Sequence, residues 1–254
     1  MTAYALSSPV AHEGQMPWMA HLLELRRRII WSVVAVAVGA VAGWFLYPVV
    51  FGFLLHPYRD IASSSIANGD LLATSPLDGF AVRIKITAYV AIGLAMPVIL
   101  WQIWRFVSPG LHRHERRYAL PFVAVAIVLF ASGAAIAYWT LPKALEWLAD
   151  VGGSNITQAY TADKYFQLIA YMMLAFGIAF EFPILLIFLQ MAGIVPNTVL
   201  RQHWRHALVG IAVVVAVATP SNDPISMLAL SVPLWLFYGV AVAFGWARDR
   251  RRHA

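Results

Sequence analysis

Six apolar runs constrain the fold of this 254-residue chain more than any other feature. A membrane-spanning helix needs about 20 predominantly apolar residues to cross a hydrocarbon core about 30 Å thick. We predict helices over 29–47, 81–104, 119–141, 165–191, 204–218 and 225–246. The fifth run, 204–218, is shorter than about 20 residues, so its helix must thin the bilayer, kink or be supported by neighbouring helices. The pattern predicts an all-α polytopic membrane protein with six transmembrane helices in one integral membrane domain, residues 1–254.

Composition excludes several other classes of protein. Hydrophobic residues make up 61% of the chain and charged residues only 12%, so the excess of apolar side chains must face lipid. Cysteine is absent, which excludes disulfides and cysteine-based metal or redox sites. The formal net charge is +6, and the basic residues that produce it lie in short clusters between the apolar runs. We therefore expect contact with membrane lipid and no nucleic-acid partner.

Arginines are concentrated on one side of the predicted bundle. They precede the first run and follow the sixth, and they occupy the connections between runs two and three and between runs four and five. The positive-inside rule therefore predicts a cell-membrane protein with both termini in the cytoplasm. On the opposite side, residues 48–79 and 142–164 are expected to form long external loops that fold over the outer ends of the helices.

The first run carries two glycines, Gly39 and Gly43, four residues apart. Small residues at this spacing allow a second helix to approach closely, and we favour packing within the chain over contact between copies. The three arginines before the run resemble those of a secretory signal, but the run is too long for one. We therefore expect an uncleaved first helix.

Two glutamates interrupt the arginine-rich segments. Glu24 precedes Arg26, Arg27 and Arg28, and Glu115 lies in the sequence SPGLHRHERR. Each could pair locally, Glu24 with Arg28 four residues later and Glu115 with a neighbouring arginine, for a few tenths of a kcal/mol. Each is also the only acid in its segment, and both lie on the same predicted membrane face. This placement favours a joint role for the two carboxylates.

Three segments resemble motifs of the twin-arginine translocase subunit TatC. They are HLLELRRRI, WRFVSPGLHRHERR and FGIAFEFPILL, and ATSPLDGFAVRIKIT and TPSNDP extend the match over most of the chain. The resemblance implies a concave bundle of six helices with both termini inside. It implies a receptor that reads the paired arginines of a signal peptide and, with the single-helix partners TatA and TatB, supports export of folded proteins driven by the proton-motive force. It also implies a homo-oligomer within the complex, no catalytic centre, no metal and no cofactor.

The resemblance assigns the two glutamates a shared role. Glu24 and Glu115 match glutamates of the family, and we expect them to bind the two guanidinium groups of the peptide. Bidentate guanidinium–carboxylate bonds select arginine over lysine, which lacks the planar fork. The neighbouring arginines are expected to repel weakly bound basic peptides. The surrounding positions, which we expect to shape the site, are Leu25, Arg26, Phe106, Pro109, Gly110 and Leu111.

Glu181 lies deep in the fourth run with no other charged residue near it in sequence. Inserting such an acid costs on the order of 2–3 kcal/mol, so it usually faces a cavity or a partner. Pro183 removes a backbone donor two residues later and predicts a kink that opens a concavity. In the family the matching glutamate lines a concave membrane face and is associated with polar groups on partner helices. A hydrogen bond to Glu181 within the bundle is the alternative.

Two positions depart from the family pattern. Met227 stands where many members have glutamine, and Gly239 stands where they often have an acid. The first removes a usual polar contact with partner helices. We expect Thr219 and Ser226 to supply part of that contact.

A proton-coupled solute transporter, with Glu181 as its relay, is the main alternative function. Transporters usually contain inverted repeats and paired interrupted helices, and the sequence shows neither. An intramembrane enzyme is disfavoured because the chain has no HExxH motif and no Ser–His–Asp set. Four histidines cluster at the predicted inner ends of the runs, where they do not form such a set: His112, His114, His203 and His206.

Overall fold

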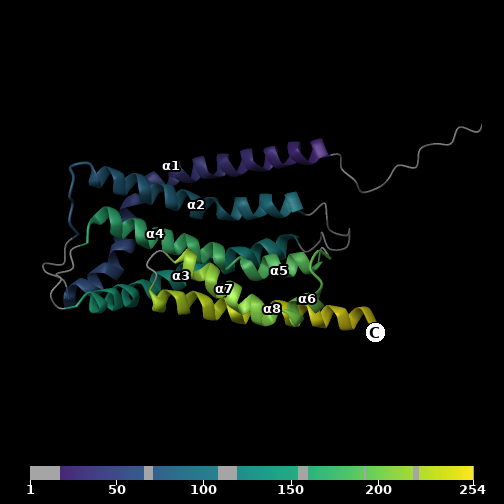
Figure 1. Cartoon of the computed structure of the whole chain (residues 1–254). Coiled ribbons are helices and arrows are strands. Elements are labelled where there is room, and N and C mark those ends of the chain that lie inside the picture. The colour runs from purple at the N-terminus through teal and green to yellow at the C-terminus, as the bar shows by residue number, and fades with distance from the viewer. Residues whose placement is uncertain are drawn as a thin grey trace, which may run out of the picture.

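The described part of the chain forms a bundle of eight helices. This computed structural model describes residues 18–65, 71–107, 119–153, 160–191, 193–219 and 223–253. The helices are α1 (Trp18–Ser65), α2 (Asp78–Val107), α3 (Ala119–Gly152), α4 (Ala162–Ala179), α5 (Phe182–Met191), α6 (Asn197–Gln202), α7 (Trp204–Ala218) and α8 (Pro224–His253). Figure 1 shows the start of α1 and the end of α8 at the same end of the bundle.

Every predicted apolar run is helical. Within the part of the chain that the structure describes, five stretches are long and apolar enough to cross a membrane, and α4 and α5 together form one of them. The sixth, α7, is shorter and has the bounds predicted for the fifth run, 204–218. The prediction of an all-α membrane fold is therefore confirmed, and the predicted inner connection 192–203 contains the short helix α6.

The prediction of a loop from residue 48 was wrong for the first part of that segment. α1 continues through Pro48 and Pro57 as far as Ser65. Proline within a helix removes a hydrogen bond and commonly bends the helix. Figure 1 shows the consequence, because the second part of α1 turns away from the first and crosses the end of the bundle opposite the start of α1.

Side chains from distant helices hold this second part of α1 in place. Pro57 has no N–H to donate to the carbonyl of Phe53, and the hydroxyl of Tyr138 donates to that carbonyl at 3.0 Å instead. The rings of Phe53 and Tyr138 stack with centroids 4.3 Å apart. One residue on, the buried hydroxyl of Tyr165 donates to the carbonyl of Leu54 at 2.8 Å. The Tyr138 contact supplies the donor that Pro57 lacks, and the Tyr165 contact adds a second anchor for this part of α1.

The second predicted loop was also wrong for its first part. α3 runs through Pro142 to Gly152, so residues 142–152 are helical. The turn after Pro142 carries Ala144 and Leu145, which are fully buried. Burial of this apolar face explains why the helix continues past the proline.

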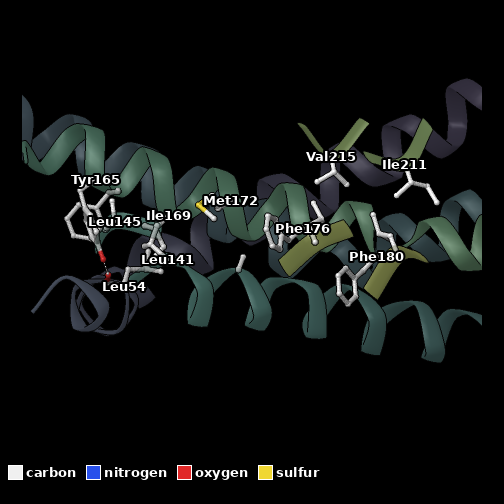
Figure 2. Close-up of a cluster of buried hydrophobic side chains, with 14 of the residues drawn as sticks. Leu54, Leu141, Leu145, Tyr165, Ile169, Met172, Phe176, Phe180, Ile211 and Val215 are labelled. Atoms are coloured by element: carbon white, nitrogen blue, oxygen red, sulfur yellow. Dashed lines mark hydrogen bonds between the residues drawn. The ribbon is translucent and has the colours of Figure 1, made fainter. Parts of the chain in front are cut away.

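The hydrophobic core follows one face of α4. Its buried side chains recur every three or four residues from Tyr165 to Phe180, as expected for one side of a helix. Figure 2 shows this row lying between Leu141 and Leu145 of α3 on one side and Ile211 and Val215 of α7 towards the other end.

The two glycines of α1 lie against α2, which confirms the predicted packing within the chain and identifies the partner helix. A Cβ added at Gly39 would lie 2.7 Å from the carbonyl oxygen of Ala91, and one at Gly43 would lie 3.1 Å from that of Thr87. The backbones of α1 and α2 therefore approach too closely for any larger residue at Gly39.

Gly39→Leu is expected to destabilise the protein. The new side chain forces α1 and α2 apart, and overpacking of this kind typically costs about 1–3 kcal/mol. The measurement is the midpoint of thermal unfolding of the purified protein in detergent. Gly52→Leu is the matched control, since Gly52 lies on the same helix with no atom near an added Cβ. Equal midpoints for the two variants would contradict the packing argument.

The fourth run, predicted as one helix with a kink from Pro183, is broken into two helices near that proline. α4 ends at Ala179 and α5 begins at Phe182, with Phe180 and Glu181 between them. Pro183 cannot donate to the carbonyl of Ala179, so the regular pattern lapses there and resumes when Leu185 N–H donates to the carbonyl of Glu181 at 3.1 Å. The break places the acidic residue at a bend.

Candidate functional site

Arginines occur near the starts of α1 and α7 and near the ends of α2 and α8. Figure 1 shows the start of α1 and the ends of α2 and α8 at the same end of the bundle. We call this the basic end. Its described arginines are Arg26, Arg27, Arg28, Arg105, Arg201, Arg205, Arg248 and Arg250.

A groove of about 300 Å³ lies between α1 and α2 at the basic end. Leu25 lines it from α1 and Phe106 from α2, so the fold brings together two residues that the sequence analysis placed in one site. Arg28 and Gln102 provide polar groups in an otherwise mainly apolar wall. The groove can therefore accommodate an apolar segment next to a charged one.

Glu24 stands beside this groove and is paired with Arg28. Arg28 Nη2 donates to Glu24 Oε1 at 2.8 Å, and Arg28 Nη1 donates to Gln102 Oε1 at 3.2 Å. The local pairing considered for Glu24 is thus present in the structure. Arg28 therefore already neutralises part of the negative charge that Glu24 offers, and a cationic ligand would have to compete with it.

The structure leaves the other half of the predicted peptide site untested. Glu115, Pro109, Gly110 and Leu111 lie outside the described residues. Arg26 is exposed and does not line the groove.

A second feature is a large apolar hollow in one side of the bundle. It has a volume of about 950 Å³ and is lined by residues of α2, α3, α4, α5 and α7, with Leu234 from α8. Among the described residues that line it, Glu181 alone is charged. The bend between α4 and α5 turns it towards the hollow.

The carboxylate of Glu181 has no hydrogen-bond partner within the part of the chain that the structure describes. Both oxygens are buried, and neither meets a donor there. The alternative of a hydrogen bond within the bundle therefore has no support among these residues. A buried acid without a partner is costly, so a donor entering the hollow would stabilise it.

The other residues predicted to contact partner helices do not join Glu181. Pro183 is buried and does not line the hollow. Thr219 is 1% exposed, and its hydroxyl donates to the carbonyl of Val215 at 3.0 Å. Ser226 is fully buried, with its N–H donating to Asp223 Oδ1 at 2.6 Å. Neither hydroxyl is presented to an approaching helix in this conformation.

These structural features are accompanied by a sequence match. The profile of a known family, described as Sec-independent protein translocase protein (TatC), matches residues 20–233. The chain belongs to the TatC family.

Individual relatives agree with the TatC profile. The chain is 40% identical over 247 residues to the Sec-independent protein translocase protein TatC of Frankia casuarinae, covering 94% of this chain and 68% of that relative. It is 37% identical to TatC of Deinococcus radiodurans, with 89% of this chain and 84% of that relative covered. A crystal structure of the twin arginine translocase receptor TatC has a TM-score of 0.74 and 33% identity, over 89% of this chain and 98% of that one.

Membership of the TatC family decides between the functional classes considered above. This chain is a multi-pass membrane component of a protein translocase and not an enzyme. As a Tat component it acts in a complex with other Tat subunits. The solute-transporter alternative is accordingly dropped.

In this TatC-family chain, hydrogen bonds from α8 and within the bundle hold the end of α5, one wall of the hollow, and the motifs of the sequence did not predict them. Arg248 of α8 donates to the carbonyls of Gln190 at 3.0 Å and Met191 at 3.3 Å, at the end of α5. A cation at the C-terminal end of a helix satisfies the last backbone carbonyls and complements the helix dipole. Gln190 Nε2 in turn donates to the carbonyl of Ala241 at 3.0 Å. The available signal was Gln190 itself, a polar residue in an apolar run.

Proposed function

We propose that this chain is the receptor subunit of a twin-arginine protein translocase. It binds the twin-arginine signal peptide of folded cargo at its cytoplasmic face and, with TatA- and TatB-type partners, supports export driven by the proton-motive force. The observation that carries the proposal is the position of Glu24 beside the groove that Leu25 and Phe106 line. More than one copy of the chain is present in the complex.

The peptide's arginines must compete for Glu24. Arg28 already occupies one oxygen of this carboxylate at 2.8 Å and is held from its other side by Gln102. An incoming guanidinium gains only the difference between its own contact and that of Arg28. A weakly bound cation therefore cannot displace Arg28, whereas two arginines held at once by Glu24 and Glu115 can.

A photo-crosslinking residue at Leu25 or Phe106 is expected to capture a twin-arginine peptide. The same residue at Phe45 is the control, because Phe45 is exposed on α1 away from the basic end. Replacing the peptide's two arginines by lysines should greatly reduce the crosslink. Equal capture at Phe45, or capture that ignores the arginines, would refute the proposed site.

We also propose a topology of six spans with both termini in the cytoplasm of a cell membrane. The start of α1 and the end of α8 lie at the basic end, which the positive-inside rule assigns to the cytoplasm. The short α7 crosses by locally thinning the bilayer. The chain, residues 1–254, forms one membrane domain.

Single cysteines should report this topology directly, because the natural chain has none. His203→Cys at the basic end should resist an impermeant thiol reagent in intact cells, and Gly153→Cys at the opposite end should react. Both positions are exposed in the structure. Labelling of residue 203 from outside would invert the proposed orientation.

We propose that Glu181 docks a polar side chain of a TatA- or TatB-type helix. Its buried carboxylate lines an apolar hollow that is open at the side of the bundle and large enough to admit side chains of another helix. A hydrogen bond formed there removes the cost of an acid without a partner. Thr219 and Ser226 would join this contact only after the ends of α7 and α8 rearrange.

A further inference from the structure

Arg83, near the start of α2, is held by aromatic rings of α1. Its guanidinium carbon lies 4.1 Å from the ring centre of Trp44 and 5.1 Å from that of Tyr47. Arginine over an aromatic face is attracted by the ring quadrupole, and tryptophan and tyrosine are typical of the membrane–water interface. This arrangement marks the level of lipid headgroups at the end of the bundle opposite the basic end.

The guanidinium of Arg83 lacks a carboxylate partner among the described residues. Its one hydrogen bond there is a long contact of 3.5 Å from Nη2 to the carbonyl of Trp44, and its Nε is buried without a partner. Two described acids at this end of the bundle are engaged elsewhere. Asp163 binds Lys85 at 2.6 Å, and Asp78 accepts hydrogen bonds from Thr74 and Ser75. Arg83 therefore has donors available for an anion.

An open apolar groove of about 490 Å³ lies between α1 and α2, and Arg83 adjoins it through its contact with Trp44. Trp44, over which Arg83 stacks, lines the groove from α1 together with Ala40. Thr87 and Ala88 line it from α2. Thr87 is one helical turn from Arg83 towards the bundle centre, so both residues lie on the same face of α2.

We propose that this groove binds an anionic glycerophospholipid of the leaflet at this end of the bundle. The phosphate contacts Arg83, whose planar donors match phosphate oxygens bidentately. One acyl chain lies in the groove past Thr87 and Ala88. The commitment to a lipid follows from the combination of a cation without a carboxylate partner, interfacial aromatic residues and an apolar channel directed into the membrane.

Charge complementarity distinguishes this site from general lipid contact. Apolar side chains elsewhere on α1 can contact any acyl chain, and they place no charge at a fixed headgroup position. At Arg83 the charge is positioned by two rings, so the site should prefer a headgroup with net negative charge. The inference does not depend on signal-peptide binding, which is proposed for the opposite end of the bundle.

Native mass spectrometry of the purified full chain in detergent tests the site. The protein is supplied with phosphatidylglycerol or with phosphatidylcholine, and the retained lipid is counted. Arg83→Gln should lower retention of phosphatidylglycerol by about fivefold, the effect of one basic residue near an anionic lipid surface. Phosphatidylcholine retention should hardly change.

Two further variants keep the test decisive. Arg59→Gln removes the same charge from an exposed position of α1 and should retain the lipid preference of the natural protein. Ala88→Phe fills the groove without touching Arg83 and should lower retention of both lipids. An unchanged preference in Arg83→Gln, or an equal loss in Arg59→Gln, would overturn the proposal. So would full retention in Ala88→Phe.

Discussion

Alanine at both Glu24 and Glu115 is expected to abolish binding of a twin-arginine signal peptide while leaving the protein inserted and folded. Removing one partner of a desolvated charge pair typically weakens binding by about 2–5 kcal/mol, which is roughly 30-fold or more. The loss from Glu24→Ala alone should be near the lower value. Arg28 already contacts Glu24 at 2.8 Å, so the peptide gains only by displacing it.

The measurement is the dissociation constant of a fluorescent twin-arginine peptide for the purified protein in detergent. Glu146→Ala is the matched control, because Glu146 is an exposed acid near the C-terminal end of α3, away from the basic end. A twin-lysine peptide should bind weakly to every variant. Undiminished arginine-peptide binding in the double variant would end the proposal that these carboxylates form the receptor site.

Glu181→Ala is expected to reduce protein export by roughly 5- to 30-fold. This range corresponds to the loss of one hydrogen bond between helices in a membrane, about 1–2 kcal/mol. Glu181→Gln should retain more export than Glu181→Ala, because an amide can still accept and donate a hydrogen bond in the hollow. Signal-peptide binding at the basic end should survive both changes.

Export of a folded reporter and crosslinking to a TatA- or TatB-type helix should be measured together. Leu185→Ala is the control for shape, since Leu185 lines the same hollow without a polar group. If Leu185→Ala impaired export as much as Glu181→Ala, the carboxylate would not be the docking group. If Glu181→Gln stopped export while crosslinking stayed intact, a proton-relay role would replace docking.

Features that depend on short stretches of sequence could be predicted for this chain. The bounds of α7 were predicted correctly because a helix within the membrane requires a continuous apolar run, which is visible in the local sequence. A distortion near Pro183 was predicted as a kink, since the loss of a backbone donor affects only its own turn, and the structure shows a full break before α5. Close packing of Gly39 within the chain was predicted from the absence of a side chain, whereas the partner helix, α2, is known only from the structure.

The candidate site could be predicted only in part. Leu25 and Phe106 were assigned from motif resemblance, and the structure brings them to one groove. The engagement of Arg28 with Gln102, which is far along the sequence, could not be read from either segment. The capping of α5 by Arg248 was missed for the same reason.

The sequence by itself determined the apolar helices, the clustering of arginine at their ends and the acid at the bend before α5. Only the tertiary structure decided how far α1 extends and what surrounds Glu181. α1 passes Pro57 because Tyr138 and Tyr165, on helices much later in the chain, donate to the carbonyls of Phe53 and Leu54. The hollow exists because several helices meet around Glu181 without filling the space. Both outcomes depend on contacts between distant segments, which local apolar length and proline placement do not specify.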